Sequence, residues 1–376
     1  MVAARCDFLG WDRSAVDLTV DWLRREFEAD LSQVVVALPG ARAGRLLMLK
    51  LREAYSGAGT LDWQPPQVVT AGGLTDEFVN LERPKAGRLV RSYAWEQALR
   101  DLALGDIEAL VARRPADSDQ QTWRRLAVEV RRVFGELSAQ GVDFHRVASE
   151  AMVNEHRSEQ RRWRALAQAQ TASERILRTA DLCDPHRGRR EALERGDLRK
   201  PARQVVLVGV VEAIGLVRQL LKALDHVTAL VFAPEDLRSA FDEIGCLRPA
   251  AWLERSWAVP MDAWRIAEGP DDQARHVLDI VSKWKDEYTA EQLSIGIGDP
   301  EVTPFLARRF RENGVFARDA QGSELHRTPP AQVLTAVAAL IDTGRFADFA
   351  ALARHPDVES LLAAKVDTRD CSFGQI

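Results

Sequence analysis

Cysteine, histidine and lysine are scarce in this chain of 376 residues. The four cysteines, Cys6, Cys183, Cys246 and Cys371, lie too far apart for the short ligand spacing of a zinc site. The seven histidines form no HExxH or HxH group. The sequence therefore predicts buried or incidental thiols and shows no metal-binding motif.

Long apolar runs are also missing. No stretch of about 18 uncharged apolar residues predicts a membrane span, and the N-terminal MVAARCDFLGWDRS has no apolar run of signal-peptide length. With 46% hydrophobic and 28% charged residues, the composition excludes a fibre, a disordered tail and a membrane-embedded body. We expect a cytoplasmic protein of two or three domains, without a membrane partner.

The charge is distributed unevenly. A net charge of -5 argues against a general polyanion binder, yet residues 123–203 contain 18 basic and 12 acidic residues. Of the 51 basic residues in the chain, 44 are arginines, whose planar guanidinium groups suit phosphate. The middle of the chain is thus either a phosphate-facing surface or a solvated helical face.

Residues 1–88 are interpreted as the first part of an α/β domain. The β-branched run Gln33–Leu38 is typical of a buried parallel strand, and a helix restarts after Pro39 and Gly40. A second strand is expected at Gln67–Thr70. Strand, glycine turn and helix open a βαβ unit, in which helix N-terminal amides can hold phosphate.

Residues 89–198 have almost wholly helical patterns and are interpreted as an insertion. An apolar stripe at three- and four-residue spacing between Trp123 and Leu137 is expected to pack in a core. Strands at Gln204–Val208 and Val227–Ala233, with a helix between them, predict a return to the first α/β domain over 199–260.

Residues 261–376 are expected to begin a second α/β domain. The pattern predicts helices and a strand at Leu293–Ile297, with one helix ending at Gly314. The C-terminal VDTRDCSFGQI contains no clear closing element, which suggests a truncated chain, although a short natural tail would look similar.

The segment LPGARAGRL at Leu38–Leu46 resembles a phosphate loop that lacks its chemistry. In a Walker A loop, GxxxxGK[ST], glycines let the backbone wrap phosphate, lysine reaches the terminal phosphates and the hydroxyl holds magnesium. With Gly44 as the second glycine, Arg45 takes the lysine position and Leu46 the hydroxyl position. Leucine cannot bind magnesium. The alternative is a simple proline–glycine turn after a strand.

The strand at Val205–Val208 lacks the acidic residues with which a nucleotide hydrolase would hold magnesium. Only Glu212 follows, several residues late. Because both expected sets of magnesium ligands are missing, we predict that the α/β unit keeps a nucleotide-hydrolase shape without hydrolysing nucleotide.

The chain resembles the N-terminal part of the B subunit of AddAB-type helicase-nucleases, bacterial double-strand break repair proteins of the PD-(D/E)XK nuclease family. The matching stretches, which follow the family's order across most of the chain, are VVVALPGARAGRLL, PPQVVTAGGL, QVVLVGVVEAIGLVRQLLKAL, VTALVFAPED, GPDDQARHVLDIV, LSIGIGDPEVTPFLARRFRENGV and TPPAQVLTAV. The resemblance implies a superfamily 1 helicase-like, P-loop NTPase-like fold, with parallel-sheet domains, a large helical insertion and degenerate motor motifs.

The resemblance also implies a function. The family's B subunit does not drive translocation, and its partner in the heterodimer, an AddA-like helicase subunit, supplies the motor. We therefore expect a non-hydrolysing DNA-binding scaffold that acts on single- or double-stranded DNA ends in homologous recombination. The family's nuclease domain, with magnesium and an iron-sulfur cluster, would lie downstream, so we expect no cofactor and no catalytic residue in this segment.

The resemblance carries over to a few residues. The family's arginine-containing turn, which replaces the phosphate loop, is matched by Gly40, Arg42, Gly44 and Arg45. Thr70 matches a threonine that lies beside the single-stranded DNA track in helicase relatives, and Gly209 matches a glycine of the degenerate acidic motif. Arg42, Arg45 and Thr70 are accordingly the candidate DNA contacts.

Three functional classes remain open from the sequence. The chain is a DNA-binding scaffold, the positioning arm of a nuclease, or a protein-interaction module that docks a motor subunit without touching DNA. Single-strand tracks combine basic residues with aromatic side chains that stack on bases. Ten tryptophans are available, among them Trp63, Trp95, Trp123, Trp163, Trp252 and Trp284, but most are expected in cores.

Overall fold

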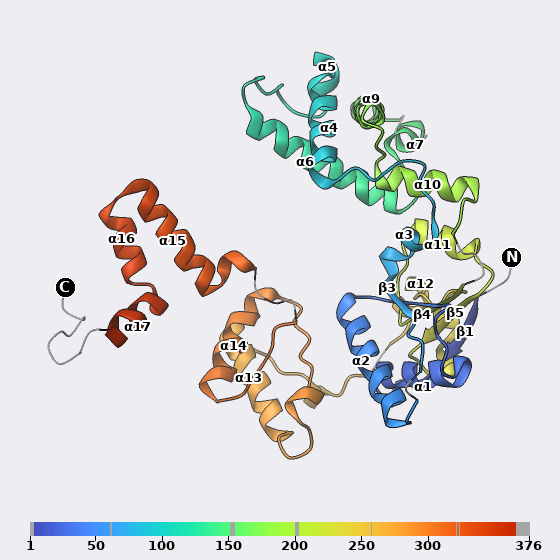
Figure 1. Cartoon of the computed structure of the whole chain (residues 1–376), viewed down its shortest axis with the longest axis vertical. Coiled ribbons are helices and arrows are strands. Elements are labelled where there is room, and N and C mark those ends of the chain that lie inside the picture. The colour runs from blue at the N-terminus through green and yellow to red at the C-terminus, as the bar shows by residue number, and fades with distance from the viewer. Residues whose placement is uncertain are drawn as a thin grey trace. The chain divides into compact units, whose positions relative to one another are not determined.

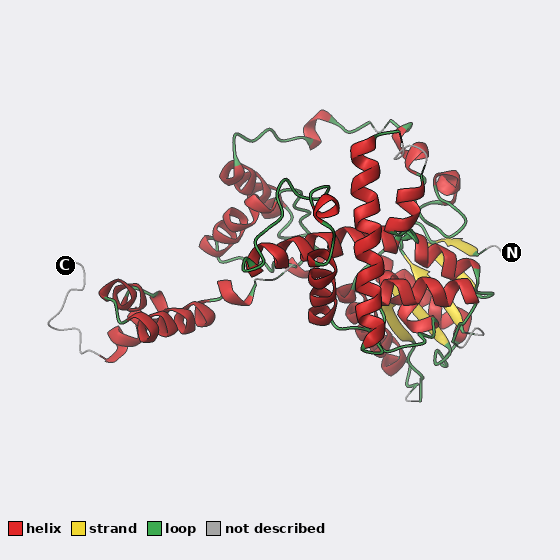
Figure 2. Cartoon of the chain, turned by 90° about the horizontal axis from the view of Figure 1, so that it is seen from above, coloured by secondary structure: helices red, strands yellow, loops and turns green. Residues whose placement is uncertain are grey.

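The computed structural model describes residues 4–60, 62–150, 155–199, 203–256, 258–320, 322 and 324–365. The chain divides into two compact units, Met1–Ser256 and Trp257–Ile376. All strands among the described residues belong to the first unit (Figure 2). None of the described helices combines the length and apolar character that crossing a membrane requires.

Five parallel strands form the sheet of the first unit (Figure 1), which confirms the predicted α/β class. In spatial order they are β1 (Arg5–Phe8), β5 (Val227–Val231), β4 (Gln204–Val208), β2 (Val34–Leu38) and β3 (Gln67–Thr70). In the centre, Val36 of β2 pairs with Val68 on one side and Val206 on the other. The chain moves outward from β2 to β3 in one direction and from β4 to β5 in the other, so the strand order reverses between β2 and β4.

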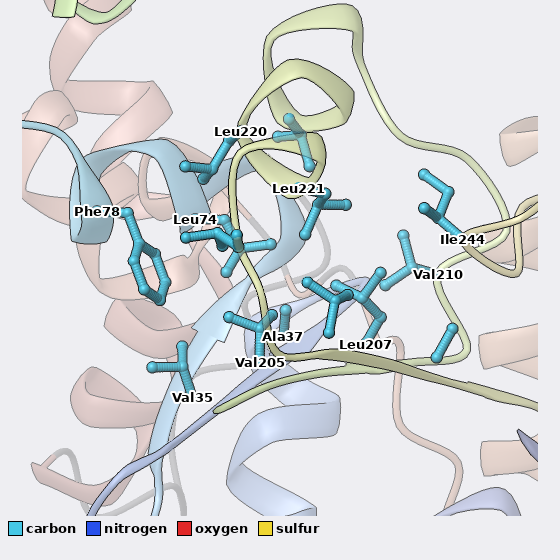
Figure 3. Close-up of a cluster of buried hydrophobic side chains, with 14 of the residues drawn as sticks. Val35, Ala37, Leu74, Phe78, Val205, Leu207, Val210, Leu220, Leu221 and Ile244 are labelled. Carbon is cyan, nitrogen blue, oxygen red and sulfur yellow. The ribbon is translucent and has the colours of Figure 1, made fainter. Parts of the chain in front are cut away.

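Helices cover both faces of the sheet, because successive side chains of a strand point to opposite sides. On one face Val34 and Val36 pack with residues of α1 (Ala15–Phe27) and α2 (Ala41–Gly57). On the other face Val35 packs with residues of α3 (Leu74–Phe78) and α11 (Gly215–Lys222), as Figure 3 shows. The central strands are therefore buried on both faces, which explains their continuous apolar sequences.

Strand β1 was not predicted. Its sequence RCDF carries charged and polar residues and lacks the β-branched run that marks the central strands. It lies at the edge of the sheet, where Cys6 pairs with Ala229 of β5, and its side chains are only partly buried or exposed. Pairing with the long-range neighbour β5, rather than local propensity, therefore makes this segment a strand.

A block of helices separates β3 from β4 in sequence, so it is an insertion between two strands of one sheet (Figure 1). Its helices are α4 (Arg88–Arg100), α5 (Leu104–Ile107), α6 (Gln120–Ala139), α7 (Phe144–Ser149), α9 (Arg157–Thr179) and α10 (Pro185–Arg195). The predicted stripe of α6 is confirmed as core, since Trp123, Val130 and Phe134 are buried in a cluster with Trp95 of α4 and Phe144 of α7.

Ion pairs join the insertion to the α/β part. Arg189 of α10 donates two hydrogen bonds, of 2.7 and 2.8 Å, to the carboxylate of Asp76 on α3. Arg203, just before β4, pairs with Glu77 at 2.9 Å. Burial acts to raise the pKa of Asp76, but hydrogen bonds from Arg189 and Lys85 outweigh it and hold that pKa below its usual value. Both acidic residues of α3 are thus neutralised by partners.

The described residues of the second unit form helices and no strand. These α-helices are α13 (Pro270–Lys283), α14 (Thr303–Glu312), α15 (Pro329–Thr343), α16 (Phe346–Ala353) and α17 (Pro356–Lys365), whereas α12 (Pro249–Leu253) lies near the end of the first unit. The cluster of Ala274, Val302, Leu306 and Phe310 packs α13 against α14. The predicted end of α14 is confirmed, with Gly314 at φ 67°.

The prediction of a strand at Leu293–Ile297 is wrong. The segment has no regular structure, and both Ile295 and Ile297 are largely exposed. An extended segment needs a neighbouring strand for its backbone hydrogen bonds, and the described part of this unit provides none. The tail VDTRDCSFGQI, from which a truncated chain was expected, lies outside the described residues.

Candidate nucleic-acid interface

The candidate interface lies at the carboxyl ends of the parallel strands. In open α/β sheets, ligands bind outside these ends, at the point where the strand order reverses. Here that point lies between β2 and β4, and β2 ends directly before Pro39 and Gly40. Sequence position and sheet topology therefore place the segment predicted as a degenerate phosphate loop at the end of the sheet where ligands bind in this class of fold.

The connection from β2 to α2 is a tight turn. Only Pro39 and Gly40 separate the two elements, and Gly40 has an extended backbone (φ -156°, ψ 157°) that other residues also adopt. Two residues are too few for a glycine-rich loop that wraps successive N–H groups around a phosphate. The alternative interpretation of the sequence, a proline–glycine turn after a strand, describes the backbone here.

Gly44 lies within α2 and allows this helix to pack closely against β3. It is buried in the first turns of α2, and a Cβ atom added there would lie 2.8 Å from Cγ1 of Val68 on β3. Glycine thus permits a close approach of helix to strand, which a larger residue would prevent.

Arg42 and Arg45 are both exposed on the first turns of α2. Neither guanidinium group forms an ion pair or hydrogen bond with any residue in the described ranges, and the first turn of α2 contains no acidic residue. The acidic residues of nearby α3 are held by Arg189, Lys85 and Arg203. The two arginines therefore keep their positive charge available at the sheet edge.

Thr70 ends β3 at the level of Leu38, its partner in the parallel ladder. Since Leu38 immediately precedes the turn into α2, Thr70 and the two arginines share one edge of the sheet. The Thr70 side chain is exposed, and its hydroxyl group has no hydrogen-bond partner among the described residues. The three residues for which the sequence predicts DNA contacts are thus all exposed on elements that meet at this end of the sheet.

A cavity of about 220 Å³ lies behind the turn. It is lined by Ala15, Val16, Thr19, Leu38, Pro39, Ala43, Leu47, Val208, Gly209 and Phe232. Thr19 is the one lining side chain with a polar group, and its hydroxyl already donates to the Ala15 carbonyl at 2.7 Å. This apolar cavity offers no side chain that would bind a triphosphate or a divalent ion. The sequence analysis missed the contributions of α1 and Phe232, which only the fold brings beside β2.

Gly209 has a backbone role at the end of β4. Its φ of 58° is in the left-handed region, and a Cβ atom there would lie 3.2 Å from the ring of Phe232. The turn and the close aromatic ring both favour glycine. The backbone conformation and the ring of Phe232 account for glycine here, and the side chains that line the adjoining cavity include no metal ligand.

Most of the tryptophans that the sequence analysis names pack against neighbouring residues in the structure. Trp95 and Trp123 are buried, Trp63 stacks on Tyr55 with ring centroids 4.9 Å apart, and the Trp252 indole donates to the Ala240 carbonyl. Trp163 packs on Phe144, and Trp284 is 41% exposed. Trp11, which the sequence analysis did not single out, is 57% exposed and follows β1 at the carboxyl edge of the sheet.

The described cysteines are separate thiols. Cys6, Cys183 and Cys246 each lie near a backbone carbonyl that accepts from the thiol. Burial raises the pKa of Cys246 to about 11, which disfavours the thiolate that metals bind. Cys371 lies outside the described residues. Within the described ranges, no three His, Cys, Asp or Glu residues come together in a way that would hold a metal ion.

Comparison of the chain with protein-family models and with curated proteins finds no match.

Proposed function

We propose that this chain is a non-hydrolysing, helicase-like DNA-binding scaffold of a helicase-nuclease B subunit. It would act in double-strand break repair by homologous recombination and guide single-stranded DNA toward a downstream PD-(D/E)XK nuclease domain. Its partners would be DNA ends and an AddA-like motor subunit. The ordered motifs support the family, and the parallel sheet with its helical insertion is compatible with a helicase-like domain.

One observation carries the proposal. At the sheet edge where a motor would hold magnesium and triphosphate, the chain has Leu46 in place of the hydroxyl and an apolar cavity, yet it keeps Arg42 and Arg45 exposed and unpaired within the described ranges. Thr70 lies at the same carboxyl end of the strands, and the exposed Trp11 follows β1, the outermost strand on the opposite side of the sheet. Guanidinium groups for phosphates and an aromatic ring for a base are the components of a single-strand track.

We expect the double substitution Arg42→Ala with Arg45→Ala to weaken single-stranded DNA binding by about tenfold at low salt, because each arginine contributes a charge-assisted contact. The logarithmic salt dependence should become shallower by about 1.4, since each lost phosphate contact contributes about 0.7 on a single strand. Fluorescence anisotropy of a labelled oligonucleotide between about 50 and 200 mM salt measures both quantities.

The matched control is Arg52→Ala with Arg125→Ala. It removes the same charge from exposed arginines, one of them on α2 but about 15 Å along the helix from Arg42. The control should bind like the unmodified protein. If the Arg42/Arg45 variant and the control bind single-stranded DNA with equal affinity, these two arginines do not contact DNA.

We also expect no ATP turnover above background, with or without DNA and magnesium. The residue positions that would hold the metal are occupied by Leu46 and by apolar side chains, and the turn before α2 is too short to wrap phosphate. Phosphate release by the purified protein checks this. DNA-stimulated phosphate release that the substitution Arg45→Ala abolishes would contradict the prediction. It would show that the turn before α2 acts as a functional phosphate loop.

A second candidate function is a protein-interaction module that docks a motor subunit without contacting DNA. Helices α15 and α16 have no buried residue, and they expose Leu334, Ile341 and Phe346 by 70 to 80%. Exposed apolar residues in such number are typical of interaction surfaces. Absence of DNA binding at low salt, together with binding of the motor subunit, would favour this function.

A further inference from the structure

The helical insertion carries a second hollow, far in sequence from the sheet edge. It is an open groove of about 580 Å³ between α7 and α9. Small residues, Ala148, Ala167 and Ala172, line part of it. Its polar lining consists of His145, Ser149, Arg164, Gln168, Thr171 and Arg175.

Four of these polar residues form one line on α9. Arg164, Gln168, Thr171 and Arg175 are spaced by four, three and four residues, which places them on the same face of a helix. The two arginines are separated by about 16 Å along the axis. The groove therefore has a guanidinium group near each end, from Arg164 and Arg175, and the amide group of Gln168 between them.

Hydrogen bonds hold the wall of the groove in place. Thr171 donates to the Ala167 carbonyl, and the His145 ring on α7 contacts the same hydroxyl at 3.0 Å, which ties the two helices together. Ser149 donates to the Arg146 carbonyl. In contrast, Gln168, Arg164 and Arg175 have no side-chain partner in the described part of the chain, so their donors are available to a ligand.

The charge around the groove supports an anionic ligand. Three arginines of the neighbouring helices are neutralised by carboxylates: Arg146 pairs with Glu150 at 3.0 Å, Arg162 with Glu159 at 2.8 Å, and Arg187 with both Glu174 and Glu191. Arg164 and Arg175 are exposed and have no such carboxylate partner among the described residues. Two arginines of the insertion that have no carboxylate partner within the described ranges thus line this groove.

We propose that this groove binds the phosphodiester backbone of a single nucleic-acid strand. A single phosphate cannot reach both arginines across about 16 Å, whereas about five stacked nucleotides span that distance at 3.4 Å per nucleotide. The small alanines let a sugar–phosphate backbone approach closely, and the guanidinium groups match phosphate geometry. The identity of the polymer rests on the proposed function; the requirement for a polyanion follows from the groove itself.

The test uses the full chain with Arg164→Ala and Arg175→Ala, and labelled oligo(dT) of about 16 nucleotides as the probe. We expect affinity at about 50 mM salt to fall by about tenfold and the salt dependence to become shallower by about 1.4. The charge-matched control is Arg113→Ala with Arg125→Ala, since both residues are exposed, neither has a carboxylate partner within the described ranges, and neither lines the groove. Circular dichroism and thermal unfolding establish that both variants are folded.

Affinity equal to that of the control overturns the proposal. So does a loss of poly-glutamate binding with unchanged oligo(dT) binding, since the groove would then accept an acidic protein segment. The Arg42/Arg45 variant separates the two interfaces. If the Arg42/Arg45 variant binds DNA normally while the Arg164/Arg175 variant does not, DNA binds in the groove and not at the sheet edge. If the Arg42/Arg45 variant loses binding while the Arg164/Arg175 variant binds normally, the groove is not a DNA-binding site.

Discussion

Gly215→Ala is expected to destabilise the first unit by about 3 kcal/mol. Gly215 begins α11, and a Cβ atom added there would lie 2.4 Å from the carbonyl oxygen of Gln140 and 2.8 Å from its carbonyl carbon. Gln140 follows α6 of the insertion, and its side-chain oxygen accepts from the Gly215 N–H at 3.0 Å. Because the clash involves backbone atoms, no side-chain rotation relieves it, and the helices must move apart.

Urea denaturation followed by circular dichroism measures this loss. Gly57→Ala is the matched control, because Gly57 is also helical, has no atom within 4 Å of its added Cβ, and has no positive φ. The control should leave stability unchanged or raise it slightly, since alanine favours helix. Equal stability of the two variants would show that α6 and α11 do not pack as closely as described.

Asp143→Ala is expected to cost about 3 kcal/mol. The Asp143 carboxylate caps α7 by accepting from the Arg146 N–H at 2.9 Å, and it accepts from Arg190 at 2.7 Å. It also accepts a hydrogen bond of 3.4 Å from the Gln170 amide nitrogen, and the Gln170 side-chain oxygen in turn accepts from the Phe144 N–H at 3.1 Å. Removing the carboxylate therefore opens a helix end and leaves the partly buried Arg190 without this partner.

Asp119→Ala is the comparison, because Asp119 also caps a helix, accepting from the Thr122 N–H, but is exposed. A smaller loss there isolates the contribution of Arg190 and Gln170. Asp143→Asn should be intermediate, since asparagine keeps the cap without the charge. Equal losses at Asp119 and Asp143 would contradict the buried network.

The same network has a pH dependence. Burial acts to raise the pKa of Asp143, but the hydrogen bonds from Arg146 and Arg190 outweigh it and lower that pKa. The resulting stabilisation is complete above the ordinary aspartate pKa of about 3.9 and is lost as pH falls through the lower, folded-state pKa. Asp143→Ala should accordingly remove part of the acid sensitivity of unfolding.

The central sheet was predictable because its strands are buried on both faces. Val34–Leu38 and Gln204–Val208 have continuous apolar sequences, which this environment requires. Strand β1 and the segment Leu293–Ile297 show where such patterns fail. The first has a poor strand sequence but a neighbour to pair with, and the second has a suitable sequence but no neighbour in the described part of its unit.

The candidate interface was predictable in part. Residue identities at Arg45 and Leu46 already exclude the usual phosphate loop, and the arginines of the insertion already suggested a phosphate-facing surface. The sequence also contains the helical spacing of Arg164, Gln168, Thr171 and Arg175. Whether an arginine is available to a ligand, however, depends on which arginines pair with carboxylates in the folded protein. Some of those partners are local, as Glu150 is for Arg146, whereas others are distant in sequence, as Asp76 is for Arg189.

The sequence by itself determined the α/β class, the helical character of the insertion and the loss of magnesium-binding residue types, because these follow from local periodicity and from side-chain chemistry. Only the tertiary structure decided that the turn before α2 is too short to wrap phosphate, that Thr70 shares an edge with Arg42 and Arg45, and that α7 and α9 enclose a groove. These features depend on strand register and helix packing, which join residues that no local pattern connects.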